Sequence, residues 1–203
     1  MIRKFGLAIL LVTGLITQGC GKENHPTKKS PKSKPALYLD WHNKCLDGKT
    51  KDIDAQIDNF EAQIKADHDD NLARVYLGSA CALRAKESFW GPTKLKYLNR
   101  GNELMDAAVK NAPDNPRIRM VRAIGYYKMP KRFGKRPTAV ADFEKLLAVA
   151  ENKPSSLQTN EWQVVLYFAS CAFKEESHKD ANKAKKLCHQ LAPTSKYGKL
   201  TAE

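Results

Sequence analysis

Apolar residues recur every three or four positions from Ala36 almost to the end of the chain, and no stretch keeps the alternation typical of a half-buried strand. A chain with this period can bury its apolar side chains only along helical faces, so the sequence predicts an all-α domain. Asp47-Gly48 is typical of a helix end, and Asn115-Pro116 is typical of a helix start. The expected helices, which form four hairpins, span residues 37–46, 52–66, 71–86, 93–111, 116–127, 137–151, 157–175 and 179–191.

The hairpins repeat a spacing of large and small residues. The first helices carry Leu77, Gly78 and Cys81; Arg122, Ala123 and Tyr126; and Phe168, Ala169 and Ala172. The second helices carry Gly101 and Met105, Ala139 and Phe143, and Ala181 and Lys185, with Pro113 and Pro193 closing two of the units. This pattern resembles the tetratricopeptide repeat, in which small residues let two helices cross closely. The resemblance implies a short right-handed solenoid of about four hairpins, a fold that carries no single activity.

The repeats are unequal in length. Insertions around Phe89-Trp90 and between Pro130 and Pro137 bring the spacing to roughly 45 residues, a value also found in HEAT and armadillo repeats. The last hairpin has no insertion and favours the tetratricopeptide-like solenoid over a HEAT-like stack or a generic helical bundle. The first hairpin keeps only an apolar stripe, which includes Phe60, and is expected to act as a cap.

The N-terminus has the anatomy of a secretory signal. Arg3 and Lys4 precede an apolar run from Phe5 to Ile16, which is too short to span a bilayer. A small residue, Gly19, stands directly before Cys20, and this arrangement resembles the lipobox of bacterial lipoproteins. The resemblance implies cleavage before Cys20, acylation of that cysteine and an extracytoplasmic domain anchored to the cell membrane or outer membrane. The alternative is ordinary secretion with a free Cys20.

The segment after Cys20 is polar and rich in lysine and proline, and it cannot bury enough apolar surface to offset chain entropy. We therefore expect a disordered tether. The predicted organisation is a lipoprotein signal peptide at residues 1–19, the lipidated cysteine and tether at 20–35, a tetratricopeptide-like domain at 36–195 and a C-terminal tail at 196–203.

The chain is basic, with 35 Lys and Arg against 22 Asp and Glu. Part of the excess falls in the signal and the tether, so the domain is only moderately basic. No recognisable nucleic-acid module accompanies the charge, and the sequence predicts no nucleic-acid partner.

Motifs for nucleotide, zinc-protease and serine-hydrolase chemistry are absent from the sequence, so we expect no enzyme, no cofactor and no metal site. The acidic run from Asp67 to Asn71 imitates a calcium loop, but Leu72 stands where the loop needs glycine. A turn that caps the following helix is the favoured interpretation.

Four cysteines follow Cys20, namely Cys45, Cys81, Cys171 and Cys188. Export would permit disulfides, but three of these cysteines fall at or beside helical packing positions, which favours burial without bonding. Cys171 with Cys188 is the preferred pair if one forms.

The repeat register predicts a groove lined by the first helix of each hairpin. Its partner-binding candidates are Ser79, Ile124, Tyr127, Ser170 and Phe173. The Lys and Asn clamp that holds peptide carboxylates in some tetratricopeptide domains is missing, so the expected ligand is apolar or aromatic. The alternative is that the insertion around Phe89-Trp90 folds back and covers this surface.

The segment after Tyr127 carries positive charge without neighbouring acids, and its prolines and Gly134 exclude a regular helix. The anion-binding candidates are Lys131, Arg132, Lys135 and Arg136, for a phosphate-bearing lipid, a glycan or an acidic partner. The alternative is internal pairing, with Asp142 and Glu144 as acids and with Arg119 and Arg122 as partly buried bases.

These features predict a membrane-anchored scaffold for protein–protein interaction in the bacterial envelope, with an unknown envelope protein or peptide as its partner. One alternative is an enzyme or a sugar-binding or lipid-binding domain whose site lies in the insertions between helices. Another is a permanent subunit of an envelope complex.

Overall fold

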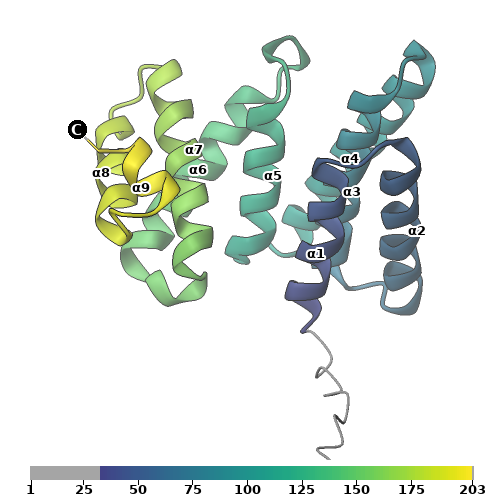
Figure 1. Cartoon of the computed structure of the whole chain (residues 1–203), viewed down its shortest axis with the longest axis horizontal. Helices are drawn as coiled ribbons and strands as arrows, with labels where there is room; N and C mark the ends of the chain where they lie inside the picture. The colour runs from purple at the N-terminus through teal and green to yellow at the C-terminus, as the bar shows by residue number, and fades with distance from the viewer. Residues whose placement is uncertain (1–32, 203) are drawn as a thin grey trace, which may run out of the picture. The chain divides into compact units, whose positions relative to one another are not determined.

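The computed structural model of the chain describes residues 33–202, and within that range the fold is all-α without a strand (Figure 1), which confirms the predicted class. The helices are α1 (Lys34–Leu46), α2 (Thr50–Ala66), α3 (Asn71–Glu87), α4 (Gly91–Asn111), α5 (Pro116–Lys128), α6 (Arg136–Asn152), α7 (Thr159–Glu175), α8 (Ala181–Leu191) and α9 (Lys196–Leu200). One-turn 3-10 helices at Lys131–Phe133 and Pro154–Ser156 precede α6 and α7. The expected signal peptide and Cys20 lie outside the described residues.

Side-chain caps explain where α3 and α5 begin. The Asp70 carboxylate accepts a hydrogen bond from the backbone N–H of Ala73 at 2.8 Å, so the acidic run before α3 caps that helix as predicted. The side chain of Asn115 accepts from the N–H groups of Arg117 and Ile118, and Pro116 occupies the first helical position of α5.

The helices pack as successive hairpins. In the pairs α3/α4, α5/α6 and α7/α8 the two helices pack against each other, and each even-numbered helix also contacts the odd-numbered helix that follows it. The odd-numbered helices contact one another in chain order from α1 to α9. The odd-numbered helices therefore form one layer and the even-numbered helices another, with a continuous apolar core between them.

The closest helix crossing lies between α3 and α4. A Cβ atom added to Gly78 would lie 2.7 Å from the backbone oxygen of Gly101 and 2.7 Å from Cγ of Met105. A Cβ atom on Gly101 would in turn lie 2.7 Å from the backbone oxygen of Gly78. The two backbones touch because neither position carries a side chain, as the repeat register predicts.

The last hairpin departs from that register. Ala184 and Cys188 are the fully buried residues of α8, whereas Ala181 and Lys185 are only partly buried. The turn before α8 includes Ser177 at φ 52° and continues to residue 180, which moves the packing positions three residues along the chain.

Both ends of the domain differ from the predicted boundaries. Lys34 belongs to α1 rather than to a tether, and its ammonium lies 2.9 Å from the Asp70 carboxylate. Residues 196–200 form α9 rather than a free tail, and Gly198 is buried where this helix packs on α7 and α8. The hydroxyl of Ser195 caps α9 by accepting from the N–H of Gly198 at 2.9 Å.

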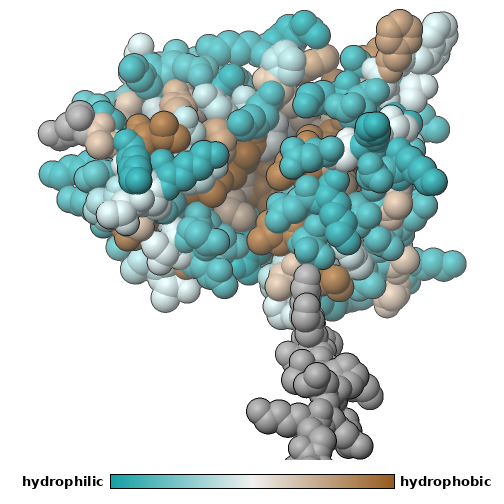
Figure 2. All heavy atoms as spheres, in the orientation of Figure 1, coloured by the Kyte–Doolittle hydropathy of each residue, from teal (hydrophilic) through white to brown (hydrophobic). Residues whose placement is uncertain are grey.

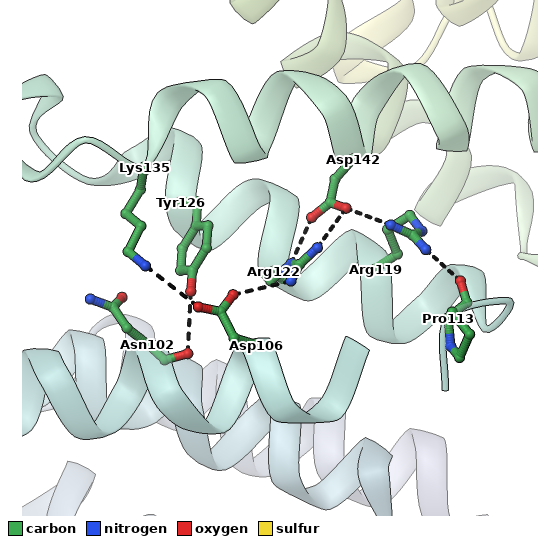
Figure 3. A network of polar contacts seen from close by, with 8 residues as sticks. All are labelled: Asn102, Asp106, Pro113, Arg119, Arg122, Tyr126, Lys135 and Asp142. Carbon is green, nitrogen blue, oxygen red and sulfur yellow. Dashed lines mark hydrogen bonds and ion pairs between the residues drawn. The ribbon is translucent and has the colours of Figure 1, made fainter. Parts of the chain in front are cut away.

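A polar network joins α4, α5 and α6 (Figure 3). Asp142 on α6 is 2% exposed, and it accepts hydrogen bonds from Arg119 at 2.6 Å and from Arg122 at 2.8 and 2.9 Å. Arg122 also donates to Asp106 on α4, and Arg119 also donates to the carbonyl of Pro113. One buried carboxylate thus accepts hydrogen bonds from two guanidinium groups, and Asp106 supplies a second negative charge to the cluster.

Gly78→Ala is expected to destabilise the fold by about 1 to 3 kcal/mol, because the added methyl group overpacks a backbone contact. Thermal unfolding would measure the effect. Gly91→Ala is the matched control, since nothing lies within 4 Å of a Cβ atom there. An equal shift in both variants would contradict the close crossing.

Asp142→Ala is expected to cost about 3 to 5 kcal/mol, because it leaves two largely buried guanidinium groups without their carboxylate. Urea unfolding of the variant would measure the loss. Asp58→Ala removes an exposed carboxylate on α2 that has no ion pair among the described residues, and its effect should stay within about 0.5 kcal/mol. A cost below 1 kcal/mol for Asp142→Ala would refute the structural role of the network.

Candidate functional site

Two residues predicted to line the groove lie in the interior. Phe173 is fully buried, with its ring stacked on His178 at a centroid distance of 4.5 Å and edge-on to Phe143 at 6.5 Å. Ser79 is 7% exposed, and its hydroxyl is hydrogen-bonded to Nε2 of His42 on α1 at 2.8 Å. The groove prediction is therefore wrong for these two residues, because α1 covers Ser79 and the α7–α8 turn covers Phe173.

The other three predicted groove residues, Ile124, Tyr127 and Ser170, are partly exposed on the neighbouring helices α5 and α7. The Tyr127 hydroxyl donates to Oε1 of Glu175 at 2.7 Å. Burial, together with this hydrogen bond, raises the pKa of Tyr127 to about 12, so its phenol is neutral at pH 7. The Ser170 hydroxyl donates to a backbone carbonyl of its own helix at 2.8 Å. These polar groups are held by local partners.

Four partly exposed rings form a continuous series across α5, α7 and α9, and we name them the aromatic row: Tyr127, Phe168, Tyr167 and Tyr197. The distances between successive ring centroids are 5.8 Å for Tyr127 and Phe168, 5.1 Å for Phe168 and Tyr167, and 5.0 Å for Tyr167 and Tyr197. Contacts at this range hold the rings in fixed relative positions. The row is therefore an ordered apolar surface rather than a set of isolated exposed residues.

Basic side chains lie over the rings of the aromatic row. The distances from the charged group to the ring centroid are 4.3 Å for Lys128 and Phe168, 4.1 Å for Arg136 and Tyr127, and 5.6 Å for Lys196 and Tyr197. The hydrogen bond from Tyr127 and the charges of Arg136 and Lys131 together lower the pKa of Glu175, although partial burial opposes the shift. The surface around the row thus combines aromatic area with positive charge.

The space-filling view (Figure 2) shows a recess on the face formed by the odd-numbered helices. Figure 2 shows apolar surface over α5 and α7 in a hollow between the parts of the surface formed by α9 and by α1. The odd-numbered helices form the floor of this hollow. Three residues of the aromatic row, Tyr127, Phe168 and Tyr167, belong to the helices α5 and α7 over which this hollow opens.

The basic segment after Tyr127 is an irregular connection, as predicted. It makes one 3-10 turn and ends at Gly134, whose φ of 67° is left-handed. Three of the four anion-binding candidates already face carboxylates: Lys131 lies 3.0 Å from Glu176, Lys135 lies 3.5 Å from Asp106, and Arg136 lies 3.4 Å from Glu175. An anion at these three residues would have to compete with those partners.

The fourth candidate, Arg132, has no ion pair within residues 33–202 and lies beside the ring of Phe133 at 5.2 Å. Arg119 and Arg122 pair with Asp142, which was the acid expected for internal pairing. Glu144, the other expected acid, instead contacts His178 at 2.8 Å. Anion binding by the basic segment stays a prediction, and Arg132 is the candidate that has no carboxylate partner among the described residues.

The insertion around Phe89-Trp90 does not cover the groove. Phe89 is 102% exposed and Trp90 is 67% exposed, at the turn between α3 and α4. The fold-back alternative is therefore wrong, because these rings point into solvent and not onto the layer of odd-numbered helices.

All four cysteines of the domain are free. Cys45, Cys81 and Cys188 are buried and Cys171 is partly exposed, which confirms burial without bonding as the favoured interpretation. Burial raises the pKa of the Cys45 and Cys81 thiols to about 11, so neither thiol is an activated nucleophile.

Sequence reasoning missed three members of the aromatic row. Phe168 was assigned only to packing, Tyr167 beside it was passed over, and Tyr197 fell in the predicted tail. The sequence did contain a signal, because Tyr167 and Phe168 are adjacent on an amphipathic helix. Two neighbouring positions on a helix lie about 100° apart, so both rings cannot face the core.

The described residues contain no group of three or more His, Cys, Asp or Glu side chains suited to a metal ion, and none of their helices is long and apolar enough to cross a membrane. Comparisons of this chain with protein-family models, with curated proteins and with solved structures found no match.

Proposed function

We propose that this chain is a lipid-anchored interaction scaffold of the bacterial cell envelope, and that it binds a partner protein through the aromatic row. The observation that carries the proposal is the row itself, in which four ordered rings from three helices stay partly exposed. Tyrosine and other aromatic side chains are enriched at the energetic centres of protein interfaces, because they bury much apolar area with few rotatable bonds.

The order of helix contacts supports a tetratricopeptide-like solenoid as the scaffold. Successive odd-numbered helices contact one another, and each even-numbered helix bridges to the next hairpin. The Gly78–Gly101 crossing stands at the small-residue positions of the repeat pattern. In such a solenoid the first helices of the hairpins line one face, and most of the aromatic row lies on α5 and α7, which are first helices.

The charges beside the aromatic row indicate the chemistry that a complementary partner segment would carry. Lys128, Arg136 and Lys196 lie over the rings, whereas Glu175 is the acid that contacts the row directly, through Tyr127. A complementary segment therefore presents apolar or aromatic side chains next to carboxylates. The Tyr127 and Ser170 hydroxyl groups are engaged by Glu175 and by the backbone, which favours binding over catalysis at this surface.

A photo-crosslinking residue placed at Tyr167 or Tyr197 tests the binding face in living cells. We expect one stoichiometric protein adduct from both positions and no such adduct from Lys145, which is exposed on α6 in the other layer. Tyr167→Ala and Tyr197→Ala should each weaken the association by about 2 kcal/mol, the cost typical of a central interface residue. Thermal unfolding of each variant controls for lost stability.

Equal crosslinking from Lys145 and from the aromatic row would contradict a specific binding face. Crosslinking to glycans or lipids, with no protein adduct, would instead favour the alternative of a sugar-binding or lipid-binding domain.

The anchor requires a separate test. A labelled fatty acid should enter the wild-type protein, whereas Cys20→Ala should lose the label and accumulate as the uncleaved precursor. Cys171→Ala is the matched control, because this other cysteine is partly exposed within the domain. Unchanged labelling of Cys20→Ala would overturn acylation at that residue and leave the binding face unaffected.

A further inference from the structure

The turn between α3 and α4 carries the most exposed apolar side chains of the described residues. Phe89 is 102% exposed and Trp90 is 67% exposed, and Leu95 on the first turns of α4 is 54% exposed. We name Phe89 and Trp90 the aromatic tip. Burial of a large aromatic side chain stabilises a folded protein by roughly 2 kcal/mol, and the exposed rings of the tip contribute none of this free energy to the domain.

The aromatic tip is held by ordered backbone on both sides. Before it, Ser88 is buried, accepts from Arg84 at 2.7 Å and donates to the Arg84 carbonyl at 2.9 Å. Arg84 in turn donates to Asp54 on α2 at 2.7 Å. After it, the carbonyl of Trp90 accepts from the N–H of Lys94 at 2.9 Å as α4 begins. The two rings are therefore presented at a fixed place on the domain.

Three lysines lie close to the tip in the sequence. Lys86, Lys94 and Lys96 make no ion pair to any described residue, and Glu87 is the acid between them in the chain. Figure 1 shows the α3–α4 turn at the same end of the helices as the connection from α5 to α6, where Arg132 is also without an ion pair. Aromatic area and positive charge are thus found together at this end.

We propose that the aromatic tip inserts into the interfacial region of an anionic lipid bilayer. Aromatic side chains on a basic surface favour the boundary between head groups and acyl chains, and each lysine near an anionic surface adds about 1 kcal/mol. A protein partner fits less well, because a stable protein interface buries about 800 Å² on each side and the tip offers two projecting side chains. A bilayer requires no complementary pocket.

This inference extends the proposed anchoring and does not depend on it. With Cys20 acylated as proposed, the lipid and the aromatic tip would contact the same membrane. In that arrangement the acyl chains retain the protein, and the tip fixes the orientation of the domain relative to the bilayer.

Tryptophan fluorescence of the full chain tests the proposal directly. Trp162 is 1% exposed, Trp41 is partly exposed and packed against Phe60, and Trp90 is 67% exposed. Trp90 is therefore the tryptophan expected to respond most strongly to lipid, and the variant Trp90→Phe separates its signal from that of Trp41. On vesicles of phosphatidylcholine and phosphatidylglycerol, emission should shift to the blue, and lipids brominated on their acyl chains should quench it. Trp90→Phe should lose both signals, and its remaining emission should match that of the protein without vesicles.

Binding measurements complete the test. In a chain that begins at Lys32, which keeps the compact helical unit and lacks both Cys20 and the apolar signal segment, Phe89→Ser with Trp90→Ser should lower vesicle partitioning about tenfold or more. Leu200→Ser, which removes a 55% exposed leucine on α9, should leave it unchanged. Changing Lys86, Lys94 and Lys96 to Gln should weaken partitioning several-fold on anionic vesicles and leave neutral vesicles unaffected.

A protein that sediments with vesicles while the Trp90 emission stays unshifted and unquenched would overturn insertion of the tip, whatever the state of Cys20. An emission shift that appears only with a partner protein would also overturn it. A failure of acylation alone would reduce sedimentation of the wild-type chain but would keep quenching of Trp90 at high lipid concentration.

Discussion

The buried carboxylate of Asp142 is the centre of a charge cluster that joins helices α4, α5 and α6. A carboxylate at this depth is tolerated because Arg119 and Arg122 supply three hydrogen bonds to it, and both arginines come from the neighbouring helix α5. Arg122 then reaches Asp106 on α4, so one charge cluster fixes how α4, α5 and α6 lie relative to one another. Because α5 also carries Tyr127, the position of the aromatic row depends on this cluster.

The same cluster limits what the basic segment can do. Arg119 and Arg122 pair with Asp142 inside the domain, so they add little charge to the surface beside the basic segment. Lys135 shares Asp106 with Arg122, at 3.5 Å and 3.1 Å respectively. Arg132 and the lysines of the α3–α4 turn make no ion pair to a described residue, and the same holds for other surface lysines such as Lys185 and Lys186. The positive charge on the surface therefore depends on which basic side chains form ion pairs within the domain. A count of basic residues along the sequence does not give this distribution.

Local rules predicted most of the fold, whereas the site required tertiary information. Cap residues such as Asn115 and the small residues Gly78 and Gly101 act within one helix or one hairpin, so their consequences can be read from spacing. Spacing in the sequence does not show which residues at the edge of a helix face are buried by neighbouring helices and turns. Phe173 was expected in the groove and is buried, because the turn that carries His178 closes over it. The five-residue helix α9 is too short to show any periodicity.

The aromatic row and the aromatic tip occupy separate parts of the domain, and this separation has a consequence for the two proposed interactions. The row lies on α5, α7 and α9, whereas the tip lies at the α3–α4 turn and shares no described contact with the row. Interactions at sites without shared partners are additive, so a membrane contact at the tip neither competes with nor requires a ligand at the row. Contact at the tip would instead fix which way the row faces along the membrane, which raises the encounter rate with partners held at the same surface.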